Sequence, residues 1–432
     1  MADTHLWSAG RRERISALDA SNLRIERHGY PMTVSALAVL EPTSTLARGS
    51  QVDLDALSRS LAARVSSVPR LRQVLVQARS WGGGLAWADD PDFDLRSRLR
   101  SCRLPSPGDE AALLDACCEI NRTGLDPTRS PWELWLLTGR DDGTVALLLR
   151  LHHVVADGIA ALTLLGALFD PLSDAGQARG RRSSRPGPVL RAAAVLDLVR
   201  LLREHGPAPA LSFNQPVTGE RQVTLVRADL GQLKAAAHAR DGTVNDVLLA
   251  AVGEGVRALC QWRDEPASGQ LLRVSVPATL RTPGEASAGG NRVAVRLMPV
   301  RLDEPDPGRL LTEVVRTTRA VKRRPPLQPS GRLLQRWMVR GMARQRLVNV
   351  LLSNLPGPEH FLRFQGSRVR ELLQLGPLQG NVPLNFSVLS YDGKVTIAIT
   401  SDRVLVPDVA RVAEGMTTAM ARLGALQLEG AT

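Results

Sequence analysis

Two adjacent histidines lie between two apolar segments, in Leu151-His152-His153-Val154-Val155-Ala156-Asp157-Gly158. The preceding residues 144–149 are almost all apolar and of strand length, which predicts a strand buried on both faces. The Ala- and Leu-rich residues 159–169 that follow predict a buried helix. The histidines are therefore expected at the end of a central strand, where open α/β sheets often bind ligands.

The chemistry of this stretch favours a general base. A histidine titrates near neutral pH, so it can take and return a proton under working conditions. The stretch contains no Ser or Cys and so offers no covalent nucleophile. Gly158 permits a tight turn or the close approach of a ligand. The simplest interpretation is a histidine that activates a substrate hydroxyl or amine.

Other interpretations stay open on these residues alone. Asp157 either caps the helix that follows or holds the histidine loop, and one role does not exclude the other. A His-His-Asp cluster can also bind a metal, or both histidines can be packing residues. The remaining histidines are scattered and lack ligand spacing: His5, His28, His205, His238 and His360.

The pattern His152-His153-x-x-x-Asp157-Gly158 resembles the HHxxxDG motif of the coenzyme A-dependent acyltransferase superfamily. More narrowly, the chain resembles the bacterial wax ester synthase/diacylglycerol acyltransferase (WS/DGAT) family. One departure is Arg129-Ser130-Pro131-Trp132, where the family has Arg-Pro-Leu-Trp; it bears on the local loop and the acyl-chain preference. The further matches are Leu18–Arg24 (family pattern LDAxFLxxE), Pro131-Trp132-Glu133, Val244–Val247, Gly290-Asn291 with Leu297–Val300, Ser353–Pro358, and Leu384-Asn385 with Ser390–Gly393.

This resemblance implies an α/β fold of two chloramphenicol-acetyltransferase-like halves, each a mixed sheet with flanking helices. A crossover linker joins them, and the active site is expected in a tunnel between them. We expect an N-terminal half over residues 1–170 and a C-terminal half over 216–432. The intervening residues 171–215, rich in Arg, Gly, Ser and Pro, predict the linker, with an amphipathic helix in its second part.

The function implied is transfer of a fatty acyl group from acyl-coenzyme A to diacylglycerol or a long-chain alcohol, without a covalent intermediate. Acyl-coenzyme A is a co-substrate, and no bound cofactor or metal is expected. His153 is the implied general base, His152 shapes the site, and Asp157 is structural, with Arg24 as its expected partner. Gly158 gives room. Trp132, Asn245 and Asn291 are the expected substrate-binding residues.

Two alternatives share this scaffold. A natural-product acyltransferase can use a carrier-protein thioester or a non-lipid acceptor with the same motif. A non-catalytic lipid-binding protein is the alternative from another class. The intact HHxxxDG pattern argues against it, because binding alone does not need that combination of residues.

Composition limits the partners. The 432 residues are 44% hydrophobic and 23% charged, as in a globular protein with a large core. The net charge of +12 favours anionic partners such as coenzyme A or an anionic membrane surface. Aromatic residues make up 3%, and no helix-turn-helix or zinc pattern is present, so nucleic-acid binding is not expected.

The location predicted is cytoplasmic. None of the four cysteines forms a Cys-x-x-Cys pair, which favours a reduced protein. No signal-type segment and no run of 18 apolar residues is present, so any membrane or lipid-droplet contact is expected to be peripheral. Its candidate segments are 188–204 and 332–346. In the second, Arg332, Arg336, Arg340 and Arg344 recur on one helical face, a pattern typical of an interfacial helix or of an ordinary surface helix.

Overall fold

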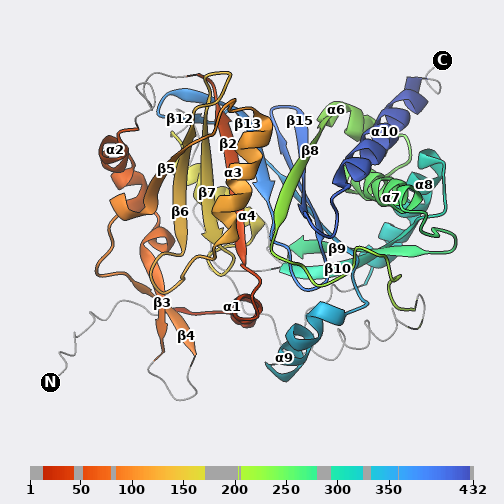
Figure 1. The fold of residues 1–432 in the computed structure, drawn as a ribbon, viewed down its shortest axis with the longest axis horizontal. Coiled ribbons are helices and arrows are strands. Elements are labelled where there is room, and N and C mark those ends of the chain that lie inside the picture. Colours follow the sequence, from red (N-terminus) through yellow and green to blue (C-terminus); the bar gives the residue numbers. More distant parts are fainter. Residues whose placement is uncertain are drawn as a thin grey trace.

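Two six-stranded sheets lie side by side and form the two halves of the molecule (Figure 1). The structure is a computed structural model, and it describes residues 13–42, 52–78, 84–170, 203, 206–279, 293–324, 332–358 and 360–428. Within these ranges, no helix is both long and apolar enough to cross a membrane.

The N-terminal sheet is built around β7 (Val145–His152), in which every residue is buried. β7 pairs antiparallel with β2 (Thr33–Leu40) on one side and with β6 (Trp132–Thr138) on the other, and β6 and β7 form a hairpin. The turn of that hairpin places Gly143 at a φ of 71°, where glycine is favoured. The strand order is β12 (Arg363–Phe364), β13 (Ser367–Leu375), β2 (Thr33–Leu40), β7, β6 (Trp132–Thr138) and β5 (Leu99–Arg103).

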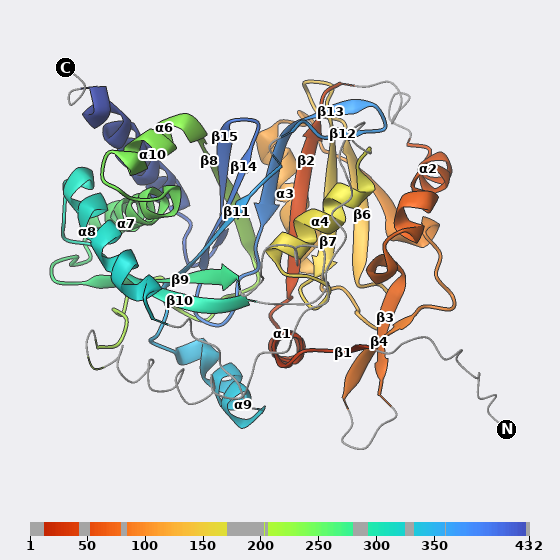
Figure 2. The same cartoon turned by 180° about the vertical axis from the view of Figure 1, so that it is seen from behind.

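Helices cover both faces of this sheet, so alternate side chains of β7 enter different cores. Leu147 and Leu149 pack with helices α2 (Leu54–Ser66) and α4 (Gly158–Leu168). Ala146 and Leu148 pack instead with helix α3 (Glu110–Arg122) on the opposite face. Figure 1 shows α3 before the sheet, and Figure 2 shows α4 from behind. The prediction of a strand buried on both faces is confirmed.

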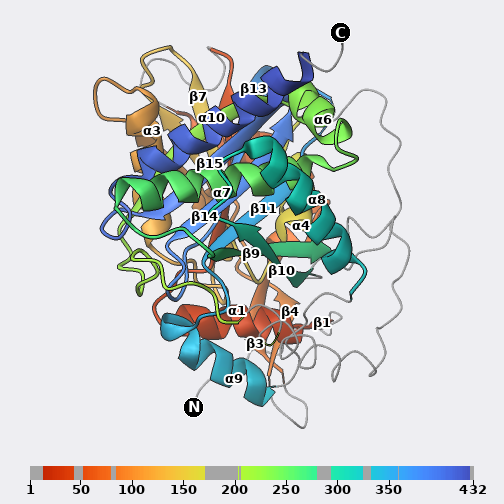
Figure 3. The ribbon, with the colours of Figure 1, turned by 90° about the vertical axis from the view of Figure 1, so that its right-hand side faces the viewer.

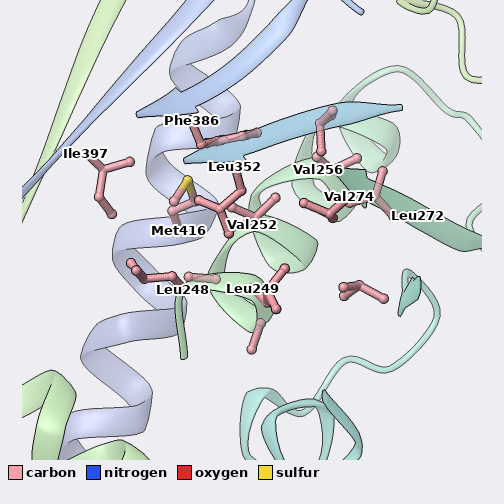
Figure 4. Close-up of a cluster of buried hydrophobic side chains, with 14 of the residues drawn as sticks. Leu248, Leu249, Val252, Val256, Leu272, Val274, Leu352, Phe386, Ile397 and Met416 are labelled. Atoms are coloured by element: carbon pink, nitrogen blue, oxygen red, sulfur yellow. The ribbon is translucent and has the colours of Figure 1, made fainter. Parts of the chain in front are cut away.

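The C-terminal sheet carries its helices on one face (Figure 3). Its strands are β10 (Val293–Arg301), β9 (Leu271–Thr279), β11 (Val350–Pro356), β14 (Leu384–Tyr391), β15 (Lys394–Asp402) and β8 (Arg221–Asp229), in that order. Its helices are α6 (Leu230–His238), α7 (Val244–Trp262), α8 (Pro307–Lys322) and α10 (Val409–Leu428). Figure 4 shows the core between them, where Leu248, Val252 and Met416 meet Leu352 and Phe386 of the sheet.

The sheets do not follow the division predicted at residues 171–215. Strands β12 and β13 come from the C-terminal part of the chain but complete the N-terminal sheet, where β13 pairs antiparallel with β2. Gln374 of β13 also reaches the other sheet, since its Nε2 donates to the carbonyls of Ser353 (3.1 Å) and Val388 (2.9 Å). β13 therefore joins both sheets, and its sequence did not predict a strand. Residues 171–202 of the predicted linker lie outside the described residues.

Smaller elements complete the fold. A three-stranded sheet is formed by β1 (Glu13–Arg14), β4 (Leu85–Asp89) and β3 (Gln73–Gln77). Helix α1 (Ala17–Arg27) is capped by Ser16, and helix α9 (Arg332–Gly341) lies beside it (Figures 1 and 2). Short 3-10 turns span Pro69–Arg72, Arg96–Arg98 and Met342–Arg344.

The double hydrogen bond of Gln374 predicts a measurable contribution to stability. Replacing Gln374 by Leu removes both donors, and we expect the free energy of unfolding to fall by about 1–3 kcal/mol. Denaturant unfolding of wild type and variant measures this loss. The same change at Gln77, which is exposed on β3, is the control. Equal effects of the two substitutions would show that Gln374 does not tie the sheets together.

Candidate active site

The two histidines lie where β7 ends, next to the start of β2. His152 is the last residue of β7 and stands opposite Thr33 of β2. The backbone N–H of His153 donates to the carbonyl of Met32 at 2.7 Å. The chain then turns at once, because the N–H of Val155 donates to the carbonyl of His152 at 2.8 Å. The position of both rings is thus fixed by a central strand.

His152 is fully buried, and both of its ring nitrogens are occupied. Its Nδ1 accepts a hydrogen bond from the backbone N–H of Val154 at 3.0 Å. The neutral ring therefore carries its proton on Nε2, which lies 2.6 Å from Oε2 of Glu26 and donates to it. With one nitrogen accepting and the other donating, His152 has no free position for a substrate proton.

His153 is partly exposed, in contrast to its neighbour. Burial of the ring lowers its pKa below the ordinary histidine value of 6.5. A hydrogen bond to its own backbone and the charges of Asp157 and Asp19 raise the pKa in opposition, and His152 lowers it further. A histidine with a lowered pKa is neutral at physiological pH, which is the form that accepts a proton.

Asp157 caps helix α4, one of the roles left open by the sequence. Its buried Oδ1 accepts a hydrogen bond from the N–H of Ala160 at 3.0 Å. A cap of this kind fixes the direction in which the helix leaves the histidine loop. The expected pairing of Asp157 with Arg24 of α1 stays a prediction.

Gly158 lies at the boundary between the halves. A Cβ built on this residue would stand 2.7 Å from Cδ1 and 3.3 Å from Cγ of Leu355, on β11 of the C-terminal sheet. Leu355 is itself buried, so it has little room to move away. A side chain at position 158 would therefore push the first turn of α4 away from β11. The absence of a side chain at Gly158 therefore leaves space for Leu355 of β11.

A buried polar network supports the end of β7. Arg150, which shares a face of the strand with His152, donates to Oε2 of Glu133 at 2.8 Å. Its Nε donates to Oδ1 of Asn121 at 3.2 Å, and the same oxygen accepts from Ser35 Oγ at 2.8 Å. Burial lowers the pKa of Arg150, and Glu133 raises it in opposition. The network joins β7 to its neighbouring strands and to α3.

The expected substrate-binding residues lie in different surroundings. Trp132 is fully buried, and its Nε1 donates to the carbonyl of Leu71 at 2.7 Å, so it is part of the core and not of an accessible surface. Asn245 is partly exposed in the first turn of α7. Its neighbour Asp246 accepts from the N–H and Oγ1 of Thr243 and closes that turn. Asn291 lies outside the described residues.

Glu26 is the site residue that the sequence analysis missed. It sits on α1 and stands at the final position of the LDAxFLxxE pattern, two residues beyond Arg24. A Cβ on Gly124 would come within 2.9 Å of Oε1 of Glu26, so this glycine leaves space for the carboxylate. The signal was present in the pattern, but its partner His152 is distant in sequence.

A cavity of about 260 Å³ adjoins the histidine loop. Val155 and Ala156 of the loop line it, together with Ala160 and Leu164 of α4. Arg70 lines the same cavity and forms an ion pair with Glu13 at 2.7 Å. Glu13, Gln73 and Thr163 also line the cavity, so the space beside the motif combines apolar side chains with polar and charged ones.

Three of the four cysteines are buried and offer no nucleophile. Cys117, Cys118 and Cys260 are buried, and burial raises the pKa of Cys118 and of Cys260 to about 12. A thiol with so high a pKa stays protonated and unreactive. In the part of the chain that the structure describes, no group of three or more His, Cys, Asp or Glu side chains is placed to hold a metal ion.

Part of the apolar face of α9 is used in packing. Val339 packs in a small buried cluster with Ile25 and Met32. Ile25 directly precedes Glu26, the residue that contacts His152. Arg336, Arg340 and Arg344 are exposed on the other side. The amphipathic pattern thus corresponds to a helix that rests on α1, and its exposed face is basic.

Comparison with known proteins agrees with the order of motifs. Residues 15–206 match the wax ester synthase/diacylglycerol acyltransferase catalytic domain, and residues 289–424 match the WS/DGAT C-terminal domain. A probable diacylglycerol O-acyltransferase of Mycobacterium tuberculosis is 31% identical over 457 residues, covering 95% of this chain and 96% of the relative. A second mycobacterial protein, a putative diacylglycerol O-acyltransferase, is 30% identical and covers 96% of this chain and 91% of its own length.

Solved structures show the same fold. The wax ester synthase/diacylglycerol acyltransferase from Marinobacter aquaeolei superposes with a TM-score of 0.70 at 21% identity, over 96% of this chain and 99% of that one. The starter condensation domain of rhizomide synthetase gives a TM-score of 0.65 at 14% identity, over 96% and 94%. The expected architecture of two sheet-containing halves is confirmed. From the matches to both family domains and to relatives along their whole length, the chain belongs to the wax ester synthase/diacylglycerol acyltransferase family and is an acyltransferase.

Proposed function

We propose that the chain transfers a fatty acyl group from acyl-coenzyme A to the hydroxyl of a diacylglycerol or a long-chain alcohol, with His153 as general base. The observation that carries the proposal is the difference between the two histidines. His152 is buried with both nitrogens occupied, whereas His153 is partly exposed and its pKa is lowered by burial. Family membership supports acyl-coenzyme A as the donor.

The reaction needs no covalent enzyme intermediate. His153 takes the proton from the acceptor hydroxyl as its oxygen attacks the thioester carbonyl. The resulting tetrahedral oxyanion collapses, the carbon–sulfur bond breaks, and the thiolate of coenzyme A takes the proton back from His153. The histidine loop contains no hydroxyl or thiol side chain, which supports a single displacement.

Each neighbour of His153 then has a separate task. His152 and Glu26 hold the end of β7, Asp157 directs α4 away from the loop, and Gly158 lets β11 approach. The apolar side chains among those that line the cavity beside Val155 and Ala156 support a substrate with hydrocarbon chains.

We also propose that the enzyme works in the cytoplasm, in peripheral contact with the inner face of the membrane or with lipid droplets. The acceptors named above partition into lipid, so the enzyme must meet them at a lipid surface. The net charge of +12 and the exposed Arg336, Arg340 and Arg344 support contact with anionic lipid. The other candidate segment, residues 188–204, lies outside the described residues apart from Arg203.

Replacing His153 by Ala is expected to leave a folded protein with roughly 10²–10⁴-fold lower activity, because the general base is removed. The assay is release of free coenzyme A from palmitoyl-coenzyme A, with diacylglycerol or hexadecanol as acceptor. Thermal unfolding checks that the variant is folded.

His360→Ala is the matched control, because His360 is exposed and far along the chain from the motif. Full activity of the His153→Ala variant would rule out His153 as the base. Wild-type protein that releases no coenzyme A with either acceptor would redirect the proposal to a carrier-protein donor or another acceptor.

The lowered pKa of His153 predicts the pH dependence. The general base must be neutral, and its neutral fraction falls as the pH drops through its pKa. Because burial lowers that pKa, the acidic limb of kcat/KM is expected to have its midpoint below 6.5. Initial rates between pH 4.5 and 8.5, about two units on either side of that value, measure the limb. A midpoint at or above 6.5 would contradict the assignment.

A further inference from the structure

Helix α1 turns one polar face toward the histidine pair. Asp19, Asn22 and Glu26 are spaced by three and four residues, so they lie on the same face of the helix. Asp19 is 2% exposed and Asn22 is 6% exposed, both unusually low for polar side chains. Three polar side chains on one buried helix face are unusual in an apolar core, which suggests that they have a role at the histidine motif.

Both ends of this row are tied to the site. Glu26 accepts the hydrogen bond of His152 at 2.6 Å. Asp19 closes the capping box of α1, since its Oδ2 accepts from the N–H of Ser16 at 3.0 Å, and its charge acts on His153. Asn22 is about one turn from each of them along the helix, roughly 4.5–6 Å of axial rise away. Its side chain is therefore held between the groups that face His152 and His153.

The amide of Asn22 lacks a partner. Its Nδ2 is buried and has no hydrogen-bond partner among the described residues. Buried donors are nearly always satisfied, because an amide N–H removed from water without an acceptor is costly. Among the described residues, Oε1 of Glu26 and Oγ1 of Thr33, which stands opposite His152 in the sheet, are further buried polar atoms without a hydrogen-bond partner. The LDAxFLxxE pattern has phenylalanine at position 22, so the amide is a feature of this chain.

We propose that Asn22 Nδ2 donates a hydrogen bond to a carbonyl oxygen of a substrate bound at His153. This inference rests on the proposed function, because that function brings carbonyl groups to the site. An amide nitrogen only donates, so its ligand atom must be an acceptor. Two substrate carbonyls have this chemistry: the thioester carbonyl of the acyl donor, and an ester carbonyl of a diacylglycerol acceptor. Hexadecanol has no carbonyl, which separates the two sources.

The test is Asn22→Leu, which keeps the branched shape and removes the donor. With palmitoyl-coenzyme A as donor, we expect kcat/KM to fall about tenfold, the size of one lost hydrogen bond. A fall with both acceptors assigns Asn22 to the thioester carbonyl. A fall with diacylglycerol and not with hexadecanol assigns it to the acceptor. Unchanged kcat/KM with both acceptors overturns the proposal.

Stability separates this role from a structural one. Since Nδ2 makes no hydrogen bond to any residue that the structure describes, Asn22→Leu is expected to keep or raise the thermal midpoint. A lower midpoint that accounts for the lost activity would overturn the proposal. Asn22→Ala is the second variant in case Leu does not fit. Ser21→Ala, at the preceding position of the same helix, is the control, and it is expected to leave kcat/KM and the thermal midpoint unchanged.

A binding measurement keeps the inference independent of turnover. Palmitoyl-coenzyme A and dioctanoylglycerol are each expected to raise the thermal midpoint of wild-type protein. In Asn22→Leu, the rise given by the ligand whose carbonyl is bound is expected to be smaller. Wild-type protein that binds these ligands without turnover would contradict the proposed function alone. Equal rises in wild type and Asn22→Leu for both ligands would contradict the role of Asn22.

Discussion

The burial of β7 on both faces is the constraint on which the rest of the structure depends. A strand with no exposed residue must find backbone partners on both edges and side-chain partners in two separate layers. β2 and β6 supply the backbone partners. The side-chain partners come from α2 and α4 on one face and from α3 on the other. Because so many elements meet at β7, the residue at its end cannot shift without disturbing all of them. His152 and His153 inherit this rigidity, which a catalytic group requires.

The same burial makes two identical side chains chemically different. Neighbouring residues at a strand end point in different directions, so one ring is fully buried and the other belongs to a partly exposed residue. The inner ring gains Glu26 and a backbone donor, and it becomes a structural residue with a fixed tautomer. The outer ring gains partial exposure and a lowered pKa. A difference in environment, with no difference in residue type, is enough to divide the roles.

Local patterns in the sequence predicted the elements whose partners are near in the chain. The apolar run before His152 and the helix α4 that Asp157 caps were both recognisable from spacing and a capping residue. β13 was missed because polar residues alternate irregularly along it, and its partner β2 is far away in sequence. Glu26 was missed for the same reason, because nothing near His152 in the sequence indicates which distant carboxylate accepts its hydrogen bond. Only the tertiary structure brings such pairs together.

The pairing of β13 with the N-terminal sheet has a consequence for the order in which the chain can fold. On the ribosome, β2, β6 and β7 emerge early, but the N-terminal sheet has an open edge at β2 until residues 367–375 have been synthesised. An exposed strand edge beside a strongly apolar core is prone to pair with other chains. The N-terminal sheet therefore depends on a strand from the C-terminal part of the chain, even though the N-terminal part carries the whole histidine motif. A chain that ends before residue 367 would leave this side of β2 without its strand partner.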